Sequence, residues 1–536
     1  MLEMLFRYIK MKNVSHLLIF LFSILFASNL NAQPGSLDKS FGINGIVTTS
    51  MGARDAKVAS IAIQTDSKIV TAGYSNNGKN LDFALARYDT NGYLDETFGN
   101  NGRVITEIGS GDNSIRSVII QPDGKLVVSG YCPDSSFYDF ASARYNPDGS
   151  LDKSFGIDGI IITSFGDFSG AFSSAIQDDE KIVVAGFMGS QNSLGHNVFA
   201  LIRYNTNGTL DSTFGINGKV TTAIRNINDV ATSIGIQPDG KIVVAGYSYY
   251  QNNNGQGPDF ALARYNSNGT IDTTFSLEGK VITIIGRFSL ATKLTILNDN
   301  KILVSGSTYN GSNWDFALAQ YNTDGSIDNS FGTGGIVTTS LGFGNDYAYS
   351  SMTQPDHKII VTGSSADVSH TNFALVRYNQ DGSLDNTFGS DGIVTTAIDS
   401  NNSYLFSVVM QKNGEIVAAG STSINDTIAS FALARYNSGL NLGIVDNPVS
   451  DNSVLVFPNP IGQQATLEYV LNFEETVSIR LIDMNGITIK IFQNNQKQEA
   501  GLHEQQINLP DDLPQGIYFI ILSVAGRQVS IKIVKK

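Results

Sequence analysis

One seven-residue pattern recurs through most of this chain and constrains its fold more than any other feature. Seven copies of Gly-x-(Leu/Ile)-Asp-x-(Ser/Thr)-Phe follow one another at a period of 56 to 61 residues. They begin at Gly35, Gly92, Gly149, Gly208, Gly269, Gly325 and Gly382. A period of this length is typical of a ring or array built from one supersecondary unit.

Each repeat contains four short runs of strand-forming residues. In the second copy these runs are 102–106, 115–121, 125–131 and 140–146. Pro122-Asp123-Gly124 separates two of them, and Asp-Gly between apolar runs is a strong hairpin signal. Four antiparallel strands per repeat indicate a propeller blade, whose strands we name a, b, c and d from the centre outward.

The two ends of the repeat region predict that the blades close into a ring. The region begins on a d strand, 45–49, and ends with strands a, b and c within 404–436. Pairing of 45–49 with 431–436 would complete a seventh blade and remove an open sheet edge. A linear solenoid would instead need atypical end repeats. We therefore predict an all-β fold in which residues 33–439 form a seven-bladed β-propeller closed by its N-terminal strand.

The residues that recur in every blade are expected to be structural. An aspartate recurs in all copies (Asp38, Asp95, Asp152, Asp211, Asp272, Asp328 and Asp385), as does a phenylalanine (Phe41, Phe98, Phe155, Phe214, Phe275, Phe331 and Phe388). A turn that every blade makes needs such an Asp as an acceptor of backbone N–H bonds. Calcium is the alternative, because Asn146, Asp148 and Asp152 share a Gly-containing loop, but no closing glutamate follows. We predict turn chemistry and no metal.

Two further recurrent polar positions lie in strands c and a. Strand c carries Arg87, Arg144, Arg203, Arg264, Arg377 and Arg435, with Gln320 in the fifth blade. These arginines could bind an anion, but we expect them to form inter-blade hydrogen bonds with the recurrent aspartates. Strand a carries Ser60, Ser117, Ser173, Ser233, Ser350 and Ser407, with Lys293 as the exception, and we expect these to surround the central channel. No histidine shares their phase, so no catalytic triad and no catalytic residue is predicted.

Variation between blades is concentrated in the b–c connections. The count from the strand b glycine to the strand c phenylalanine runs from 10 (Gly73 to Phe83) to 14 (Gly246 to Phe260), whereas the a–b and c–d turns are constant. Because strands alternate in direction, the b–c and d–a loops emerge on one face, the variable-loop face. Its aromatic residues are Tyr131, Phe137, Tyr138, Tyr249, Tyr250, Tyr309 and Trp314. We predict that Tyr249, Tyr250 and Trp314 contribute to binding, with packing between loops as the alternative.

Composition excludes one class of partner. The formal charge of −14 disfavours a broad contact with nucleic-acid phosphates. Cys132 is the only cysteine, so an intrachain disulfide cannot form. Nothing in the sequence indicates a cofactor.

The N-terminal residues predict export. Arg7, Lys10 and Lys12 precede the apolar run 17–27, and Ala32 ends a plausible cleavage region. This is the organisation of a secretory signal peptide, here 1–32. The apolar run is short for a bilayer span, so we expect no transmembrane segment after cleavage.

Beyond these patterns, the repeats resemble a known family. The segments GSLDKSFGIDG, QPDGKIVVAG and FALARYN are similar to the delta-sixty repeat of predicted β-propellers, and the resemblance covers about 400 residues. The family implies a fold far more firmly than a function.

A different segment follows a predicted linker, 440–453. It begins with Pro458-Asn459-Pro460, contains Gly516-Ile517-Tyr518 and ends in Lys535-Lys536. Residues 454–536 thereby resemble the type A C-terminal sorting domain of the type IX secretion system. The resemblance implies a small β-sandwich, a partner in that secretion machinery, and a protein that is secreted or held at the outer cell surface. From the strand pattern alone, the alternative is an appended domain that binds cell wall or carbohydrate.

Two functions remain open at this point. The first is a secreted or surface-attached, non-catalytic propeller that binds a protein or glycan through its variable-loop face. The second is an extracellular hydrolase or lyase on the same scaffold, because propellers host such chemistry. Two carboxylates with raised pKa in one pocket on the variable-loop face would favour the enzyme.

Overall fold

The computed structural model describes residues 32–52, 54–134, 137–166, 168–189, 196–225, 227–252, 255–399, 401–424, 428–440, 454–471, 474–483, 488–511, 513–524 and 527–536. The predicted signal peptide, except Ala32, and the predicted linker, except Leu440, lie outside these residues. The chain divides into two compact units after Gly439, and each is described by itself.

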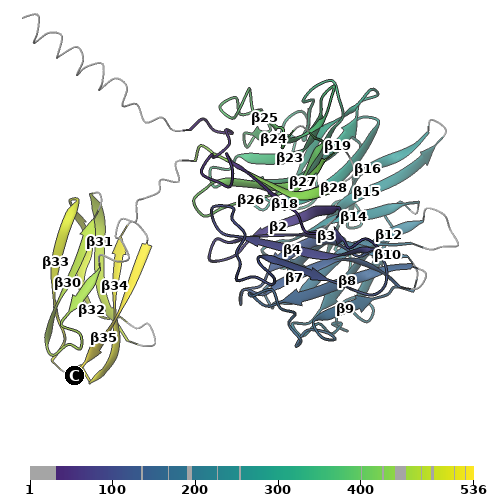
Figure 1. The fold of residues 1–536 in the computed structure, drawn as a ribbon. Coiled ribbons are helices and arrows are strands. Elements are labelled where there is room, and N and C mark those ends of the chain that lie inside the picture. Colours follow the sequence, from purple (N-terminus) through teal and green to yellow (C-terminus); the bar gives the residue numbers. More distant parts are fainter. Residues whose placement is uncertain are drawn as a thin grey trace, which may run out of the picture. The chain divides into compact units, whose positions relative to one another are not determined.

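The first unit contains seven four-stranded antiparallel sheets, drawn in Figure 1. Their inner strands, a, are β2 (Ala56–Ile63), β6 (Ser114–Ile120), β10 (Ser169–Ile176), β14 (Asp229–Ile236), β18 (Phe288–Ile296), β22 (Asp346–Thr353) and β26 (Ser403–Met410). Strands b are β3 (Ile69–Asn76), β7 (Leu126–Asp134), β11 (Ile182–Gly189), β15 (Ile242–Asn252), β19 (Ile302–Tyr309), β23 (Ile359–Ala366) and β27 (Ile416–Ile424). Strands c are β4 (Leu81–Tyr88), β8 (Phe137–Tyr145), β12 (Asn197–Tyr204), β16 (Gly255–Tyr265), β20 (Trp314–Tyr321), β24 (Thr371–Tyr378) and β28 (Ile428–Tyr436). Outer strands d are β5 (Arg103–Thr106), β9 (Ile160–Thr163), β13 (Lys219–Thr222), β17 (Lys280–Thr283), β21 (Ile336–Thr339), β25 (Ile393–Thr396) and β1 (Ile46–Thr49).

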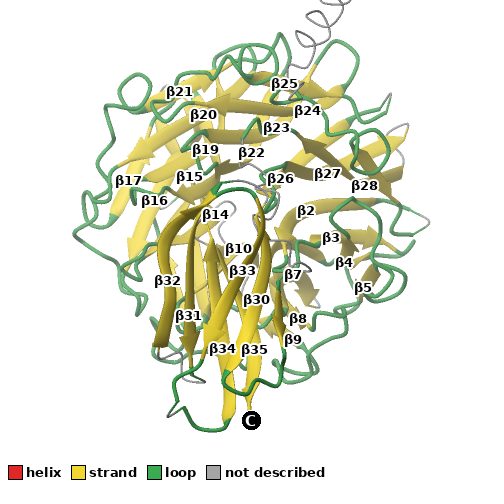
Figure 2. Cartoon of the chain, turned by 90° about the vertical axis from the view of Figure 1, so that its left-hand side faces the viewer, coloured by secondary structure: helices red, strands yellow, loops and turns green. Residues whose placement is uncertain are grey.

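The seventh blade joins the two ends of the repeat region, as the sequence predicts. Strand β1 pairs antiparallel with β28, with Thr49 opposite Phe431 and Ile46 opposite Ala434. Figure 2 shows the sheets following one another around a centre, and the inner strand β26 of the last blade contacts β2 of the first. The seven-bladed propeller closed by its N-terminal strand is therefore confirmed.

The apolar core of the ring lies between neighbouring blades. One buried cluster at the seam contains Leu433 and Phe431 of the seventh blade together with Ala56 and Ile69 of the first. The last residue of strand c adds an inter-blade hydrogen bond, because the Tyr145 hydroxyl donates to Thr106 Oγ1 of the preceding blade at 2.9 Å. The same bond crosses the seam from Tyr88 to Thr49, also at 2.9 Å. The closing strand β1 is thus bonded to the next blade in the same way as the outer strand β5.

Each inner strand contains a β-bulge at the same place. In β14 the pairing with β15 shifts register between Ala231 and Ser233, so that Thr232 is the extra residue. The facing residue is Gly246, where a Cβ would lie 1.9 Å from the carbonyl oxygen of Val230. A glycine is therefore required wherever the bulged strand approaches strand b.

The second unit is a β-sandwich of two sheets. One sheet has the order β29 (Leu455–Phe457), β30 (Gln464–Leu471), β33 (Gly501–Asn508), and the other β32 (Thr488–Gln498), β31 (Glu475–Ile482), β34 (Gly516–Val524), β35 (Arg527–Lys535). Leu467 and Tyr469 of the first sheet share a buried cluster with Ile479 and Ile520 of the second. Alternation of buried and more exposed residues along β30 and β31 explains why the two sheets pack face to face.

Candidate binding face of the propeller

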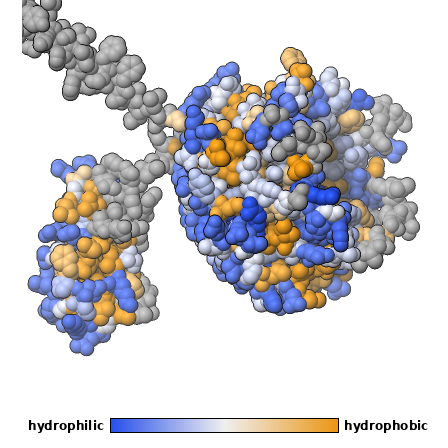
Figure 3. Space-filling view, in the orientation of Figure 1, coloured by the Kyte–Doolittle hydropathy of each residue, from blue (hydrophilic) through white to orange (hydrophobic). Residues whose placement is uncertain are grey.

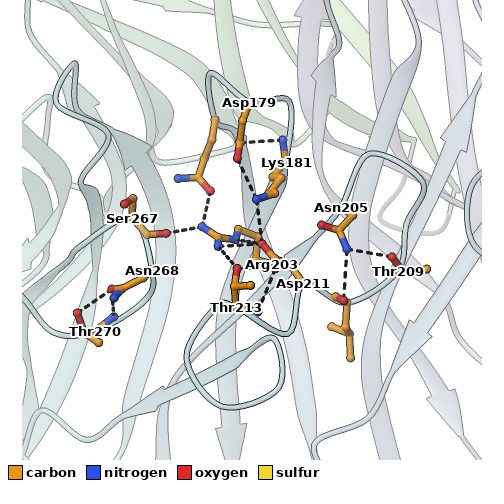
Figure 4. A network of polar contacts seen from close by, with 12 residues as sticks. Asp179, Lys181, Arg203, Asn205, Thr209, Asp211, Thr213, Ser267, Asn268 and Thr270 are labelled. Carbon is orange, nitrogen blue, oxygen red and sulfur yellow. Dashed lines mark hydrogen bonds and ion pairs between the residues drawn. The ribbon is translucent and has the colours of Figure 1, made fainter.

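A repeated polar network occupies the face of the a–b and c–d turns, and Figure 4 shows it in the third blade. Arg203 Nε donates to Asp211 Oδ2 at 2.8 Å, and Lys181 Nζ lies 3.2 Å from the same oxygen. Arg203 Nη1 also donates to the backbone carbonyl of Ser267 in the next blade. Hydrogen bonds from Thr213 and these two cations hold the pKa of Asp211 well below its usual range, against the opposing effect of burial. The network therefore fastens adjacent blades to one another.

This geometry corrects one detail of the expectation for the arginines. The Arg–Asp pair lies within one repeat, and the inter-blade bond runs from the guanidinium to a backbone carbonyl. Asp211 follows Arg203 by eight residues, so this pair is local in the sequence. The turn that contains Ser267 belongs to the next blade and reaches Arg203 only once the ring is assembled. Each guanidinium also covers the recurrent phenylalanine, as Arg203 does over Phe214 at 4.7 Å. These groups are engaged with the protein, which leaves little of them for a ligand.

The loops considered for calcium are turns closed by their own aspartates. Asp148 Oδ1 accepts from the Ser150 N–H at 2.9 Å, and Asp152 Oδ1 accepts from the Ser154 N–H at 3.1 Å. Among the described residues, no three His, Cys, Asp or Glu side chains gather into a group that could hold a metal ion.

The recurrent serines of the inner strands lie between blades and do not line the channel as expected. Ser60 Oγ accepts from the Val118 N–H of the next blade at 3.1 Å, and Ser173 Oγ accepts from the Ile234 N–H at 3.3 Å. The bulge explains the difference, because it turns the residue before each serine toward the axis. Sequence reasoning missed these bulged residues. The sequence signal that could have found them is a position in strand a that varies from blade to blade between a recurrent apolar residue and the recurrent serine.

All seven bulged residues line one hollow of about 460 Å³ on the propeller axis: Ala59, Arg116, Phe172, Thr232, Thr292, Tyr349 and Phe406. Lys57, Val58, Tyr74 and Ser114 complete its wall. Lys57, Tyr74 and Ser114 lie at the strand ends that border the variable-loop face. Tyr349 contacts Phe406 with ring centroids 5.1 Å apart. Burial, with a smaller effect of the neighbouring tyrosines, raises the pKa of Tyr349 to about 12, so its hydroxyl stays neutral at physiological pH.

A second hollow of about 270 Å³ adjoins the first and shares Arg116 and Phe172 with it. Tyr131, Tyr138 and Phe168 also line it. The Tyr138 ring packs edge-on against the Tyr131 ring at 5.2 Å and against the Phe168 ring at 5.5 Å between centroids. Aromatic residues of the second and third blades thus extend the axial hollow outward along the variable-loop face.

The three aromatic residues singled out from the sequence are half-buried at the ends of strands on the same face. Trp314 lies between Tyr309 and Tyr347, with ring centroids 5.7 and 5.8 Å away. Tyr347 in turn contacts Tyr349, so a run of rings leads from Trp314 to the axial hollow.

Tyr249 and Tyr250 lie in an extension of β15 beyond the other b strands. Tyr249 packs edge-on against Tyr247, with ring centroids 6.0 Å apart. The Tyr250 hydroxyl donates to the Arg287 carbonyl at 3.3 Å, and the Arg225 guanidinium lies 5.7 Å from its ring. Neither tyrosine lines either hollow.

No carboxylate of the described residues lines either hollow, although Asp55 and Asp112 lie near enough to raise the pKa of Tyr74 and Tyr138, after the larger effect of burial. Burial is the main cause that raises the pKa of Asp82, Asp259 and Asp346. None of the three is among the described residues that line the two hollows. The outer surface of the propeller in Figure 3 carries apolar patches separated by polar ones.

In the sandwich, the residues predicted for sorting converge at one end. Asn459 Nδ2 donates to the Lys532 carbonyl at 2.9 Å, and Asn459 Oδ1 accepts from the Val534 N–H at 3.0 Å. Gly516 pairs with Lys535, whose buried ammonium donates to the Pro510 carbonyl at 3.2 Å. The Tyr518 hydroxyl donates to the Pro514 carbonyl at 3.0 Å, while Pro458, Pro460 and Lys536 are exposed.

Family models match both units of the chain. The model described as "Domain of unknown function (DUF5122) beta-propeller" matches residues 64–98, 121–155, 177–214, 237–275, 297–331, 354–388 and 411–442. This chain is a DUF5122 β-propeller protein. The model described as "Secretion system C-terminal sorting domain" matches residues 455–536. That domain marks proteins exported by the type IX system to the cell surface or the medium, so the chain is a secreted or surface protein that engages this machinery.

Comparisons with curated proteins and with solved structures give no further information on the function of this DUF5122 propeller. None of the curated proteins matches the chain. Among solved structures, a polysaccharide lyase, Uly1, has a TM-score of 0.42 at 11% identity over 77% of this chain and 94% of its own. A protein of unknown function from Dyadobacter fermentans has a TM-score of 0.40 at 10% identity over 73% and 98%. These similarities are too distant to bear on function. No helix in the described part of the chain has the length and apolar character to cross a membrane.

Proposed function

We propose that this exported propeller is a non-catalytic binding protein that holds an extracellular protein or glycan on its variable-loop face. The observation that carries the proposal is the connected run of aromatic rings on this face, which leads from Trp314 through Tyr347 to Tyr349 and Phe406 in the axial hollow. Half-buried aromatic side chains supply large contact areas at small entropic cost. We also infer that 1–32 is a cleaved signal peptide and 440–453 a linker to the sorting domain, 454–536.

A hydrolase or lyase would need positioned acid and base groups in such a hollow. The described residues that line the two hollows include no carboxylate and no histidine. These residues therefore lack the paired carboxylates of a glycoside hydrolase, and binding through the aromatic and cationic lining is the function that they support best.

The test uses the mature chain, 33–536, on arrays of glycans and surface proteins. Replacement of Tyr249, Tyr250 and Trp314 by alanine is expected to weaken binding of a ligand found there by at least about tenfold, equivalent to about 1.4 kcal/mol. Tyr93→Ala is the matched control, because Tyr93 is an exposed tyrosine in a c–d turn on the opposite face. Unchanged affinity of the triple variant would reject the assignment of the binding face.

A further inference from the structure

The bulged positions break the sevenfold regularity of the ring in a directed way. The residue before each is a buried apolar side chain, and the residue after it is serine in every blade except the fifth. The bulged residues themselves differ in size, polarity and charge, although all seven occupy the same place in a blade. Packing alone would favour one residue type at an equivalent position. Variation among the side chains that line one hollow, at positions flanked by repeated residues, is what a ligand site requires.

Positive charge collects on one side of this hollow. Lys57 and Arg116 belong to the inner strands of the first and second blades, and both line its wall. Neither forms an ion pair with any carboxylate of the described residues, although the chain carries a net charge of −14. Asp55 is the carboxylate whose charge acts on this wall, at Tyr74, and it forms no ion pair with either cation among the described residues. Two cations that are not paired with carboxylates attract an anion.

Arg116 is held in place but has donors to spare. Its Nη2 donates to the Tyr131 hydroxyl at 3.1 Å, and its guanidinium lies 5.3 Å from the Tyr131 ring and 5.6 Å from the Phe172 ring. A guanidinium has five N–H donors and can form bidentate hydrogen bonds with a carboxylate or sulfate group. The strand c arginines are different, because carboxylates, hydroxyls and carbonyls occupy their donors.

The rest of the lining suits a sugar. Phe172, Tyr349 and Phe406 offer aromatic faces. The Thr232 and Thr292 hydroxyls between them donate to backbone carbonyls of the next blade and offer their lone pairs as acceptors. A pyranose ring has apolar C–H faces and polar edges, so it is matched by aromatic rings interspersed with hydroxyls. The two adjoining hollows, about 460 and 270 Å³, have the size of ligand sites and meet at Arg116 and Phe172. A ligand of more than one ring can therefore extend from the axis along the second and third blades.

We propose that the axial hollow binds an acidic oligosaccharide, whose carboxylate or sulfate group sits at Arg116 and Lys57 and whose sugar faces pack on Phe172, Tyr349 and Phe406. This inference rests on the proposed function and names the ligand class for the same face.

Calorimetric titration of the mature chain tests it with three probes of equal length: tri-galacturonate, its methyl ester, and a sulfated neutral trisaccharide. At least one anionic probe is expected to bind, and the two anionic arms distinguish carboxylate from sulfate recognition. The methyl ester is expected to bind at least tenfold more weakly than the uronate. Arg116→Gln and Lys57→Gln should each weaken the anionic probe by about tenfold, the usual scale of a hydrogen bond to a charged group.

Lys79→Gln is the matched control, since Lys79 is an exposed lysine of a b–c loop on the same face that lines neither hollow. It is expected to leave the affinity unchanged. Three results would overturn the inference: a uronate that binds no more tightly than its methyl ester although it does bind, undiminished binding of the anionic probe by Arg116→Gln, or no binding of either anionic probe. If the arrays then show a ligand whose binding is weakened by alanine at Tyr249, Tyr250 and Trp314, the proposed function stands and only the acidic-oligosaccharide inference fails.

Discussion

At the scale of single residues, Glu415 departs from a rule that the other six blades follow. Their strand b is preceded by a lysine that pairs with the recurrent aspartate, as Lys358 does with Asp385 at 2.8 Å. The seventh blade has Glu415 in that place, near Asp38, which comes from the N-terminal end of the ring. Burial first, and then the charge of Asp38, raises the pKa of Glu415 to about 7. The pKa of Glu415 in the folded protein thus exceeds its ordinary value of 4.5. The unfolded chain therefore loses this proton more readily than the folded protein, and the free energy of unfolding falls as pH rises from about 4.5 through 7.

Glu415→Lys should therefore stabilise the protein, and more so at pH 8 than at pH 5. The lysine would restore the pair with Asp38 and remove a like charge, for an expected rise in Tm of about 1–3 °C at pH 8. Thermal melts at the two pH values measure the effect. Glu415→Gln is the control for charge alone and should raise Tm at pH 8 but not at pH 5. A Gln variant whose difference from the native chain is the same at both values would contradict the raised pKa.

At the scale of elements, the bulged inner strand and the strand b glycine form one device. The period-2 pattern and the Pro-Asp-Gly turns predicted strands a to d, but they could not predict the bulge. Ala231-Thr232-Ser233 reads as ordinary alternation, and the extra residue appears only once the register against Ala245 and Gly246 is known. The length of β15 was also hidden, because Gln251 and Asn252 are weak strand formers and continue the strand only by pairing with Gln256 and Gly255 of β16.

Gly246→Ala should consequently cost about 1–3 kcal/mol in free energy of unfolding. The new Cβ would meet the Val230 carbonyl oxygen at 1.9 Å, so one of the two strands must shift. Denaturant unfolding of the mature chain measures the loss. Gly342→Ala is the matched control, because a Cβ there meets nothing within 4 Å and the backbone φ is not left-handed. Equal unfolding midpoints for Gly246→Ala and the native chain would show that the bulge does not require glycine.

At the scale of the whole molecule, the architecture was the most predictable feature and the site the least. Seven copies of one pattern, starting on a d strand and ending on a c strand, left one arrangement without an open edge, and β1 pairs with β28 accordingly. The site could not be found in the same way. Arg116, Phe172 and Tyr349 are more than fifty residues apart along the chain from blade to blade, and only closure of the ring brings them to one axis. Trp314 was predicted because it is a conspicuous aromatic residue beside a variable loop, and it lines neither hollow.

Closure of the ring also decides which loops share a face, so it is the claim on which the binding site depends. Hydrogen–deuterium exchange of the intact mature chain tests it directly at residues 46–49. If the ring is closed, these amides exchange as slowly as those of the other outer strands, such as 103–106 and 219–222, because all of them pair with a c strand. Complete exchange of 46–49 at the earliest time point, while the other outer strands stay protected, would contradict it.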